Sequence, residues 1–89
     1  MPSHAESNKL SNVFVRFGAR LRELRKQQGV SQESLADAAG LHRTYVSSVE
    51  RGERNISLEN IDRLATALDV ALSELMPAPL PRTNRRSDS

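Results

Sequence analysis

Residues 32 to 51 read QESLADAAGLHRTYVSSVER, and this stretch decides the fold. Its large apolar residues stand where two short helices would share a core, at Leu35, Leu41, Val46 and Val49. Ala36 is small, which allows steeply crossing helices to approach closely, and Gly40 suits a chain reversal because glycine tolerates positive φ. The stretch therefore predicts two short helices joined by a tight turn.

The second predicted helix carries polar side chains at the positions that packing leaves exposed, namely His42, Arg43, Thr44, Ser47 and Ser48. Packing requires no polar group at these positions, so they are available for recognition. For Arg43 or Ser48 taken alone, a solvated polar surface is an equally good interpretation. The five residues together favour a surface that recognises a ligand.

Helical periodicity continues upstream of this pair of helices. From about Val13 until Gly29, large apolar residues recur at intervals of three and four, and they are Phe14, Phe17, Leu21 and Leu24. Ser31 is a favourable N-cap for the first helix of the pair. His42 stands at the N-cap position of the second, which we expect to stop at Gly52.

Downstream, Ser57 precedes a helix whose expected inner face is formed by Leu58, Ile61, Leu64, Ala65 and Leu68. A short fifth helix contains Leu72, Leu75 and Met76 and ends at Pro77. The sequence has neither the alternation typical of strands nor a Gly-rich phosphate loop, so we expect a compact all-α domain of five helices. This domain should cover residues 13–76, after a flexible arm at 1–12 and before a disordered Pro- and Arg-containing tail at 77–89.

The composition limits the compartment in which we expect the protein and the chemistry that we expect it to perform. The 89 residues include no cysteine, and no apolar run approaches the roughly 20 residues of a membrane span. We therefore expect a cytoplasmic protein that binds no membrane, metal or cofactor. His4 and His42 are the only histidines, and no nucleophile motif or carboxylate cluster appears, so we expect no catalytic residue and no enzyme.

Three segments in this order, SQESLADAAG, LHRTYVSSVERG and SLENIDRLATALDV, resemble the Cro and lambda-repressor-like, or XRE, family of bacterial and phage transcription regulators. The resemblance covers about residues 13–76 and implies a lambda-repressor-like fold with a DNA-binding helix-turn-helix. The short length and the stretch LHRTYVSSVERGERN look especially like the controller proteins of restriction-modification systems. The implied function is that of a sequence-specific regulator, a repressor, an activator or both, which controls its own transcription.

In this family the second helix of the motif lies in the major groove, which makes residues 42–51 the reading helix. Arg43 is the first candidate, because a guanidinium can donate two hydrogen bonds to guanine. Thr44 can contact a thymine methyl group, and Ser48 follows one turn later. His42 and Ser47 flank the same face and are the remaining base-reading candidates.

The resemblance also implies contacts with DNA phosphates, which we assign to Gln32, Tyr45, Arg51, Arg54 and Asn55. Two alternatives stay open at this stage. The Tyr45 ring can instead cap the core and leave only its hydroxyl in water. Arg54 and Asn55 can be plain solvated surface, and Asn55 also suits a turn.

Two further pairs of charged residues acquire roles from the resemblance. Arg25 and Glu50 match a family ion pair that is largely buried, which would make Glu50 a structural residue instead of a base reader. Glu33 and Asp37 form an acidic pair at i and i+4, which is ordinarily just a solvated face. In some relatives this face contacts RNA polymerase, so a polymerase contact is a second interpretation.

Relatives dimerise through the last helix, and the apolar side chains of Leu72, Leu75 and Met76 exceed what so short a helix needs for its own attachment. We therefore expect a homodimer whose reading helices meet two half-sites of a palindromic operator in double-stranded DNA. The main alternative function is an antitoxin or anti-regulator that acts through a protein partner, with DNA binding secondary.

Overall fold

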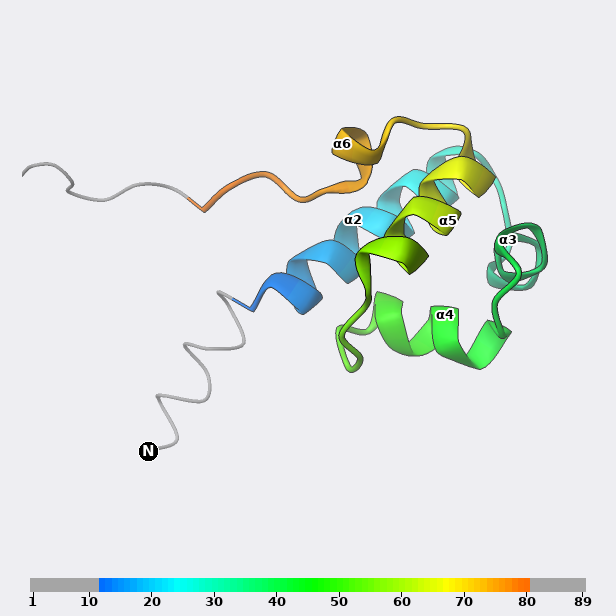
Figure 1. The fold of residues 1–89 in the computed structure, drawn as a ribbon, viewed down its shortest axis with the longest axis horizontal. Helices are drawn as coiled ribbons and strands as arrows, with labels where there is room; N and C mark the ends of the chain where they lie inside the picture. Colours follow the sequence, from blue (N-terminus) through cyan, green and yellow to red (C-terminus); the bar gives the residue numbers. More distant parts are fainter. Residues whose placement is uncertain (1–11, 81–89) are drawn as a thin grey trace, which may run out of the picture.

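The fold is known from a computed structural model that describes residues 12–80. Within this range the chain forms five α-helices and no strand (Figure 1), in agreement with the predicted all-α class. Their bounds are Val13–Gln27 for α2, Gln32–Ala39 for α3, Arg43–Glu50 for α4, Leu58–Leu68 for α5 and Leu72–Leu75 for α6. Residues 1–11 and 81–89, with most of the expected arm and tail, lie outside the described residues.

Side-chain caps explain where three of these helices begin. The hydroxyl of Ser31 accepts a hydrogen bond from the backbone N–H of Ser34 at 3.0 Å, and that of Ser57 accepts one from Asn60 at 3.1 Å. Asn12, which we assigned to the arm, instead caps α2, because its Oδ1 accepts from the N–H of Phe14 at 2.7 Å. Asn12 therefore forms part of the start of α2.

The caps of α4 and α6 are weaker. His42 holds the extended backbone of an N-cap, although its imidazole makes no capping hydrogen bond within the described residues. Ala71 has no side-chain acceptor, but the Glu74 carboxylate accepts a hydrogen bond from its backbone N–H at 3.2 Å. This bond supplies one half of a capping box and fixes the start of α6.

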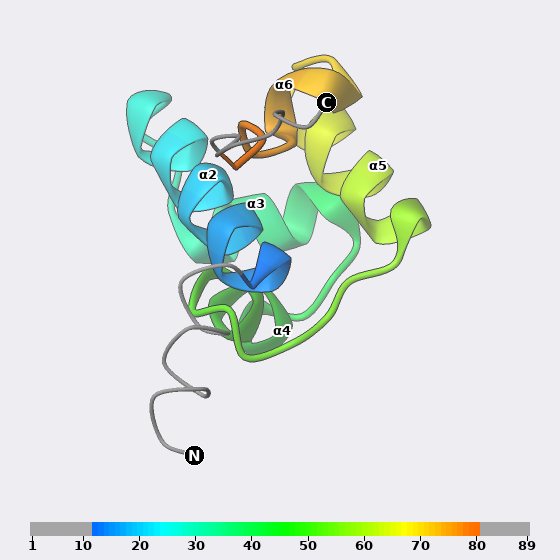
Figure 2. The same ribbon diagram turned by 90° about the vertical axis from the view of Figure 1, so that its left-hand side faces the viewer.

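The turn between α3 and α4 depends on Gly40, whose φ of 71° lies in the left-handed region. This conformation brings the backbone N–H of Leu41 to 2.8 Å from the carbonyl oxygen of Ala36. The turn then delivers the chain to α4, which packs against both α2 and α3. In two views α4 lies on the side of the domain away from α6 (Figure 1, Figure 2).

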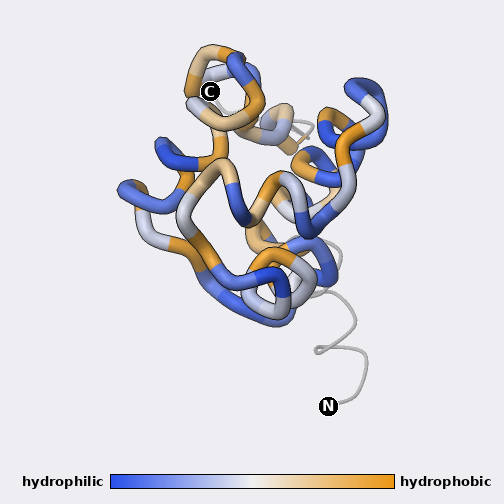
Figure 3. The backbone as a smooth tube through the Cα atoms, turned by 90° about the vertical axis from the view of Figure 1, so that its right-hand side faces the viewer, coloured by the Kyte–Doolittle hydropathy of each residue, from blue (hydrophilic) through white to orange (hydrophobic). Residues whose placement is uncertain are grey.

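The core is a single cluster of thirteen buried apolar residues, to which every helix contributes. Along the helices apolar residues alternate with polar ones (Figure 3), as expected for amphipathic helices around a shared core. The expected inner face of α5 is wrong at Leu58, which is 68% exposed. Leu58 is the first residue of the helix, and the preceding Ile56 packs against the core at this end.

Gly18 allows α2 and α4 to cross closely. A Cβ atom at this position would overlap the carbonyl oxygens of Val49 and Glu50 at the end of α4. Any larger residue would have to push these two backbones apart, although glycine is a poor helix former. Gly18 therefore determines how closely α4 packs against α2, a role that no local pattern in the sequence indicates.

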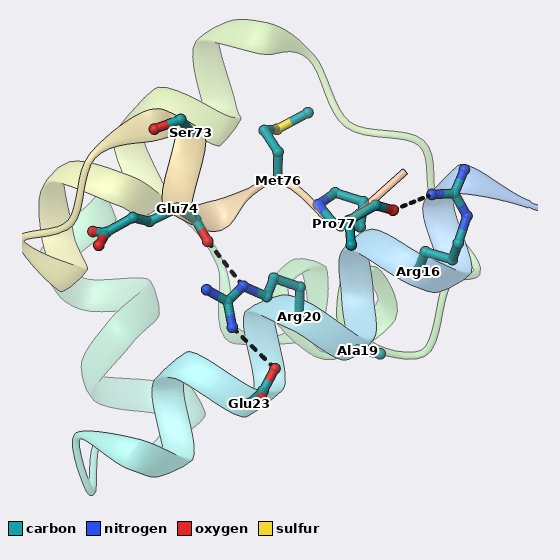
Figure 4. A pocket seen from close by; sticks show the side chains of 9 residues that line it. Arg16, Ala19, Arg20, Glu23, Ser73, Glu74, Met76 and Pro77 are labelled. Carbon is teal, nitrogen blue, oxygen red and sulfur yellow. Dashed lines mark hydrogen bonds and ion pairs between the residues drawn. The ribbon is translucent and has the colours of Figure 1, made fainter. Parts of the chain in front are cut away.

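Two arginines of α2 donate hydrogen bonds to α6 and to the segment that follows it (Figure 4). Arg20 Nε donates to the carbonyl oxygen of Glu74 at 2.8 Å, and Arg16 Nη1 donates to that of Ala78 at 3.2 Å. Arg20 also pairs with Glu23 at 3.1 Å. Residues 77–80, the start of the segment expected to be a disordered tail, thus belong to the described part and contact α2.

Leu75 was expected to lie in the dimer interface, but it is buried inside the subunit. Its side chain is 0% exposed and belongs to the core, whereas Leu72 is 36% and Met76 40% exposed. A residue with no exposed surface in the folded subunit cannot contact a second one without rearrangement. Only Leu72 on α6 and Met76 directly after it remain as interface candidates.

Candidate nucleic-acid interface

The outer face of α4 carries all the predicted base-reading side chains. Val46 and Val49 are buried and turn the opposite side of the helix into the core. Arg43 and Thr44 are exposed, as is His42 directly before the helix, whereas Ser47 and Ser48 are half-exposed. Residues three and four positions apart lie on one side of a helix, so these side chains form one continuous polar strip.

Ser47 and Arg51 are engaged with each other in the isolated subunit. Arg51 Nη1 donates to the Ser47 hydroxyl, and Arg51 Nε lies 3.1 Å from Glu53 Oε1. Both charged side chains are more than half exposed, so the ion pair contributes little to stability. Arg51 can therefore exchange Glu53 for another anion at small cost.

The Arg25–Glu50 ion pair is formed and nearly buried. Arg25 Nε lies 2.6 Å from Glu50 Oε2, and Nη2 lies 2.9 Å from Oε1, while the two side chains are only 11% and 3% exposed. The hydrogen bonding that Arg25 donates to Glu50 raises the pKa of the guanidinium, although burial opposes this effect. The remaining Nη1 donates to the Val30 carbonyl oxygen at 2.8 Å, so the pair ties α2 to α4 and to the loop before α3.

Gln32 joins this ion pair. Its Nε2 donates to Glu50 Oε1 at 3.0 Å, so the carboxylate receives hydrogen bonds from both Arg25 and Gln32. An amide nitrogen carries two hydrogens, and the bond to Glu50 uses one of them. The position of Gln32 at the start of α3 was expected, but its bond to α4 was not.

Tyr45, Arg54 and Asn60 form a second polar cluster beside α4. The Tyr45 hydroxyl accepts a hydrogen bond from Asn60 Nδ2 at 3.1 Å, and the Arg54 guanidinium carbon lies 5.5 Å from the centroid of the Tyr45 ring. The ring is half-buried and packs against the core, as the alternative interpretation of Tyr45 had it. Tyr45 also lines a cleft of about 320 Å³, together with Gly40, Leu41, His42, Thr44, Arg54 and Asn60.

Asn60 is the site residue that sequence reasoning missed. It is the third residue of α5, fifteen positions beyond Tyr45, so no periodicity within one helix relates the two. The Ser57 cap was a usable signal, because it fixed the start of α5 and hence the turn on which Asn60 lies. The remaining phosphate candidate, Asn55, is exposed in the loop between α4 and α5.

The acidic pair Glu33 and Asp37 is exposed on α3. Within residues 12–80, no three His, Cys, Asp or Glu side chains approach one another as a metal site would require. No helix of the described part is both long and apolar enough to cross a membrane.

Comparison with known proteins identifies the family. The Helix-turn-helix family model matches residues 21–75. Control protein C.MunI of a Mycoplasma species is 45% identical over 67 residues, which cover 74% of this chain and 90% of that protein. Control protein C.BamHI of Bacillus amyloliquefaciens is 43% identical over 67 residues, which cover 74% and 83%.

The fold agrees with solved structures of such proteins. The crystal structure of the restriction-modification controller protein C.AhdI from Aeromonas hydrophila matches with a TM-score of 0.70 and 60% identity. The match covers 71% of this chain and 96% of that one. The chain therefore belongs to the helix-turn-helix family of DNA-binding transcription regulators.

Proposed function

We propose that the protein is the controller of a restriction-modification system, which binds an operator in its own promoter as a homodimer. The observation that carries this proposal is the exposed polar strip on α4. The domain that presents this strip is 43–60% identical to controller proteins. Such a regulator works in the cytoplasm, where the promoter is. Its effect on transcription is repression, activation or both, depending on where the operator lies.

Base reading is assigned to Arg43, Thr44 and Ser48, with His42 and Ser47 at the edges of the strip. The exposed Arg43 guanidinium has the geometry to donate two hydrogen bonds to guanine, and the Thr44 methyl group can contact thymine. Short hydroxyl side chains at the two serines allow α4 to approach the bases closely. The buried Glu50 carboxylate takes no part in base reading.

Phosphate contacts are assigned to residues that surround the strip, namely Gln32, Tyr45, Arg51, Arg54 and Asn55. They lie at the start of α3, on α4 and in the loop after it, which is where a helix seated in the major groove would meet the two DNA backbones. Arg51 and Arg54 supply the positive charge. The dimer is assigned to the exposed apolar groups of Leu72 on α6 and of Met76 directly after it.

The variants Arg43→Ala and Arg54→Ala separate base reading from phosphate binding. We expect Arg43→Ala to weaken binding to the preferred sequence by about 1 to 3 kcal/mol and to relax the preference at one base pair. Arg54→Ala should weaken all sequences alike and reduce the slope of log affinity against log salt by about 0.9. The measurement is fluorescence anisotropy on duplexes selected by the wild-type protein from a random pool.

Two results would contradict this assignment. Equal affinity of wild-type and Arg43→Ala protein for every duplex would remove Arg43 from base reading. Failure of the wild-type protein to enrich any sequence from the pool would contradict the proposed function itself.

The exposed acidic pair on α3 supports a contact with RNA polymerase when the operator lies beside a promoter. Glu33→Lys with Asp37→Lys reverses the charge of this face without touching α4. We expect the double variant to lose transcriptional activation in vitro while its operator affinity does not fall. Unchanged activation at saturating protein would overturn the polymerase contact.

A further inference from the structure

The cluster of Tyr45, Arg54 and Asn60 joins α4, the following loop and the first turn of α5. Asn60 is held in place by its backbone, because its N–H donates to the Ser57 hydroxyl at 3.1 Å. Its side chain then reaches across to α4, where Nδ2 donates to the Tyr45 hydroxyl at 3.1 Å. An anchored amide on one helix thus determines the position of a hydroxyl on another.

The direction of this hydrogen bond determines what the hydroxyl can do next. A phenol has one proton to donate and lone pairs that accept. Asn60 Nδ2 occupies the accepting side, so the proton of Tyr45 is not consumed by this bond. Tyr45 lines the cleft of about 320 Å³ that His42 and Thr44 of the polar strip also line, so the cleft lies on the same side of the domain as that strip.

Arg54 adds positive charge at the same cleft. Its guanidinium carbon lies 5.5 Å from the Tyr45 ring centroid, within the range of a cation–π contact. Stacking on the ring limits the freedom of a side chain that is otherwise exposed. The cleft is therefore lined by one residue with a hydroxyl proton to donate and one with a guanidinium, and both groups suit an oxygen of a phosphodiester.

We propose that Asn60 is a positioning residue for DNA binding, which holds the Tyr45 hydroxyl by its accepting side so that the proton is donated to a backbone phosphate. Arg54, stacked on the same ring, supplies the charge for that phosphate. The proposal rests on the proposed function, because it requires that α4 faces DNA. It adds a role for Asn60 that acts only through Tyr45.

A double-mutant cycle on operator affinity tests this dependence. The variants are Tyr45→Phe, Asn60→Ala and their combination, and the probe is the best-bound duplex that the wild-type protein selects from a random pool. We expect Tyr45→Phe to weaken binding about tenfold or more and Asn60→Ala about 3- to 10-fold. In the Tyr45→Phe background, Asn60→Ala should change affinity by less than about twofold, because the hydroxyl on which it acts is absent.

Salt dependence provides a second readout, which separates the neutral hydroxyl from the charged guanidinium at the same cleft. A neutral hydroxyl releases no counterion, so Tyr45→Phe and Asn60→Ala should lower affinity and leave the salt slope unchanged. Arg54→Ala should lower affinity and reduce the slope by about 0.9. Thr66→Ala, on an exposed position of α5 beyond the cluster, is the matched control and should change neither quantity.

Several results would overturn the inference. Additive effects of Tyr45→Phe and Asn60→Ala would mean that Asn60 contacts DNA or stabilises α5 independently of Tyr45. A fall in thermal stability of Asn60→Ala that accounts for its loss of affinity would mean a structural role. If the wild-type protein selects no sequence, the proposed function fails, whereas selection with an additive cycle contradicts only the role of Asn60.

Discussion

Glu50→Ala is expected to lower the free energy of unfolding by about 3 to 5 kcal/mol, which is a large part of the stability of a small domain. The carboxylate is 3% exposed and receives hydrogen bonds from Arg25 and Gln32. Its removal would leave the Arg25 guanidinium, itself only 11% exposed, without a counter-ion. Urea unfolding followed by far-ultraviolet circular dichroism measures the change.

The exposed ion pair of Arg51 and Glu53 gives the matched control for this variant. Glu53→Ala also removes one partner of an arginine, but at a solvated position, so we expect less than about 1 kcal/mol. Replacing both buried partners, as Arg25→Met with Glu50→Leu, should recover much of the loss, because no unpaired charge remains. Equal destabilisation by Glu50→Ala and Glu53→Ala would contradict a structural role for the buried pair.

The buried Arg25–Glu50 ion pair also predicts how DNA binding should be lost in Glu50→Ala. Arg25 keeps its charge in this variant, because a guanidinium stays protonated in proteins even without its carboxylate partner. Unfolding of this variant should therefore be accompanied by loss of DNA binding, in contrast to Arg43→Ala, which should stay folded. Stability and DNA affinity measured on both variants distinguish a structural residue of α4 from a reading residue on the same helix.

Helix positions were predictable from the sequence because their causes are local. Ser31 and Ser57 cap the helices that follow them, and Gly40 adopts the positive φ that its turn requires. In each case the signal and the element that it determines lie within a few residues. The alternation of apolar and polar residues then indicated which side of α4 faces outward.

The errors concern positions where packing between distant segments decides. The apolar periodicity of α5 continues to its first residue, Leu58, but the partly buried Ile56 packs against the core at that end instead. On α6, a helix of four residues is too short for periodicity to distinguish a core leucine from an exposed one. Gly18 and Asn60 likewise act through partners on other helices, at Val49 and Tyr45, which no local pattern indicates.

Leu75→Ala is the second variant with a large expected effect, and Leu72→Ala is its matched partner on the same helix. Both substitutions remove the same atoms, but Leu75 is 0% exposed and Leu72 is 36% exposed. Truncation of a fully buried leucine leaves a cavity as well as losing burial, so we expect Leu75→Ala to cost about 2 to 5 kcal/mol. Leu72→Ala should cost less than about 1 kcal/mol within the subunit.

For the association constant of the proposed dimer, Leu72→Ala should be the variant with the larger effect. Leu72→Ala removes apolar surface that the dimer would bury, so we expect it to weaken association about tenfold or more in sedimentation equilibrium. Because association stabilises only the folded state, the unfolding midpoint of the wild-type protein should rise with protein concentration, and Leu72→Ala should reduce this dependence. Leu75→Ala should lower the midpoint at every concentration. If Leu72→Ala leaves the dimer unchanged, α6 does not form the interface, and if Leu75→Ala leaves stability unchanged, its burial in the core contributes nothing.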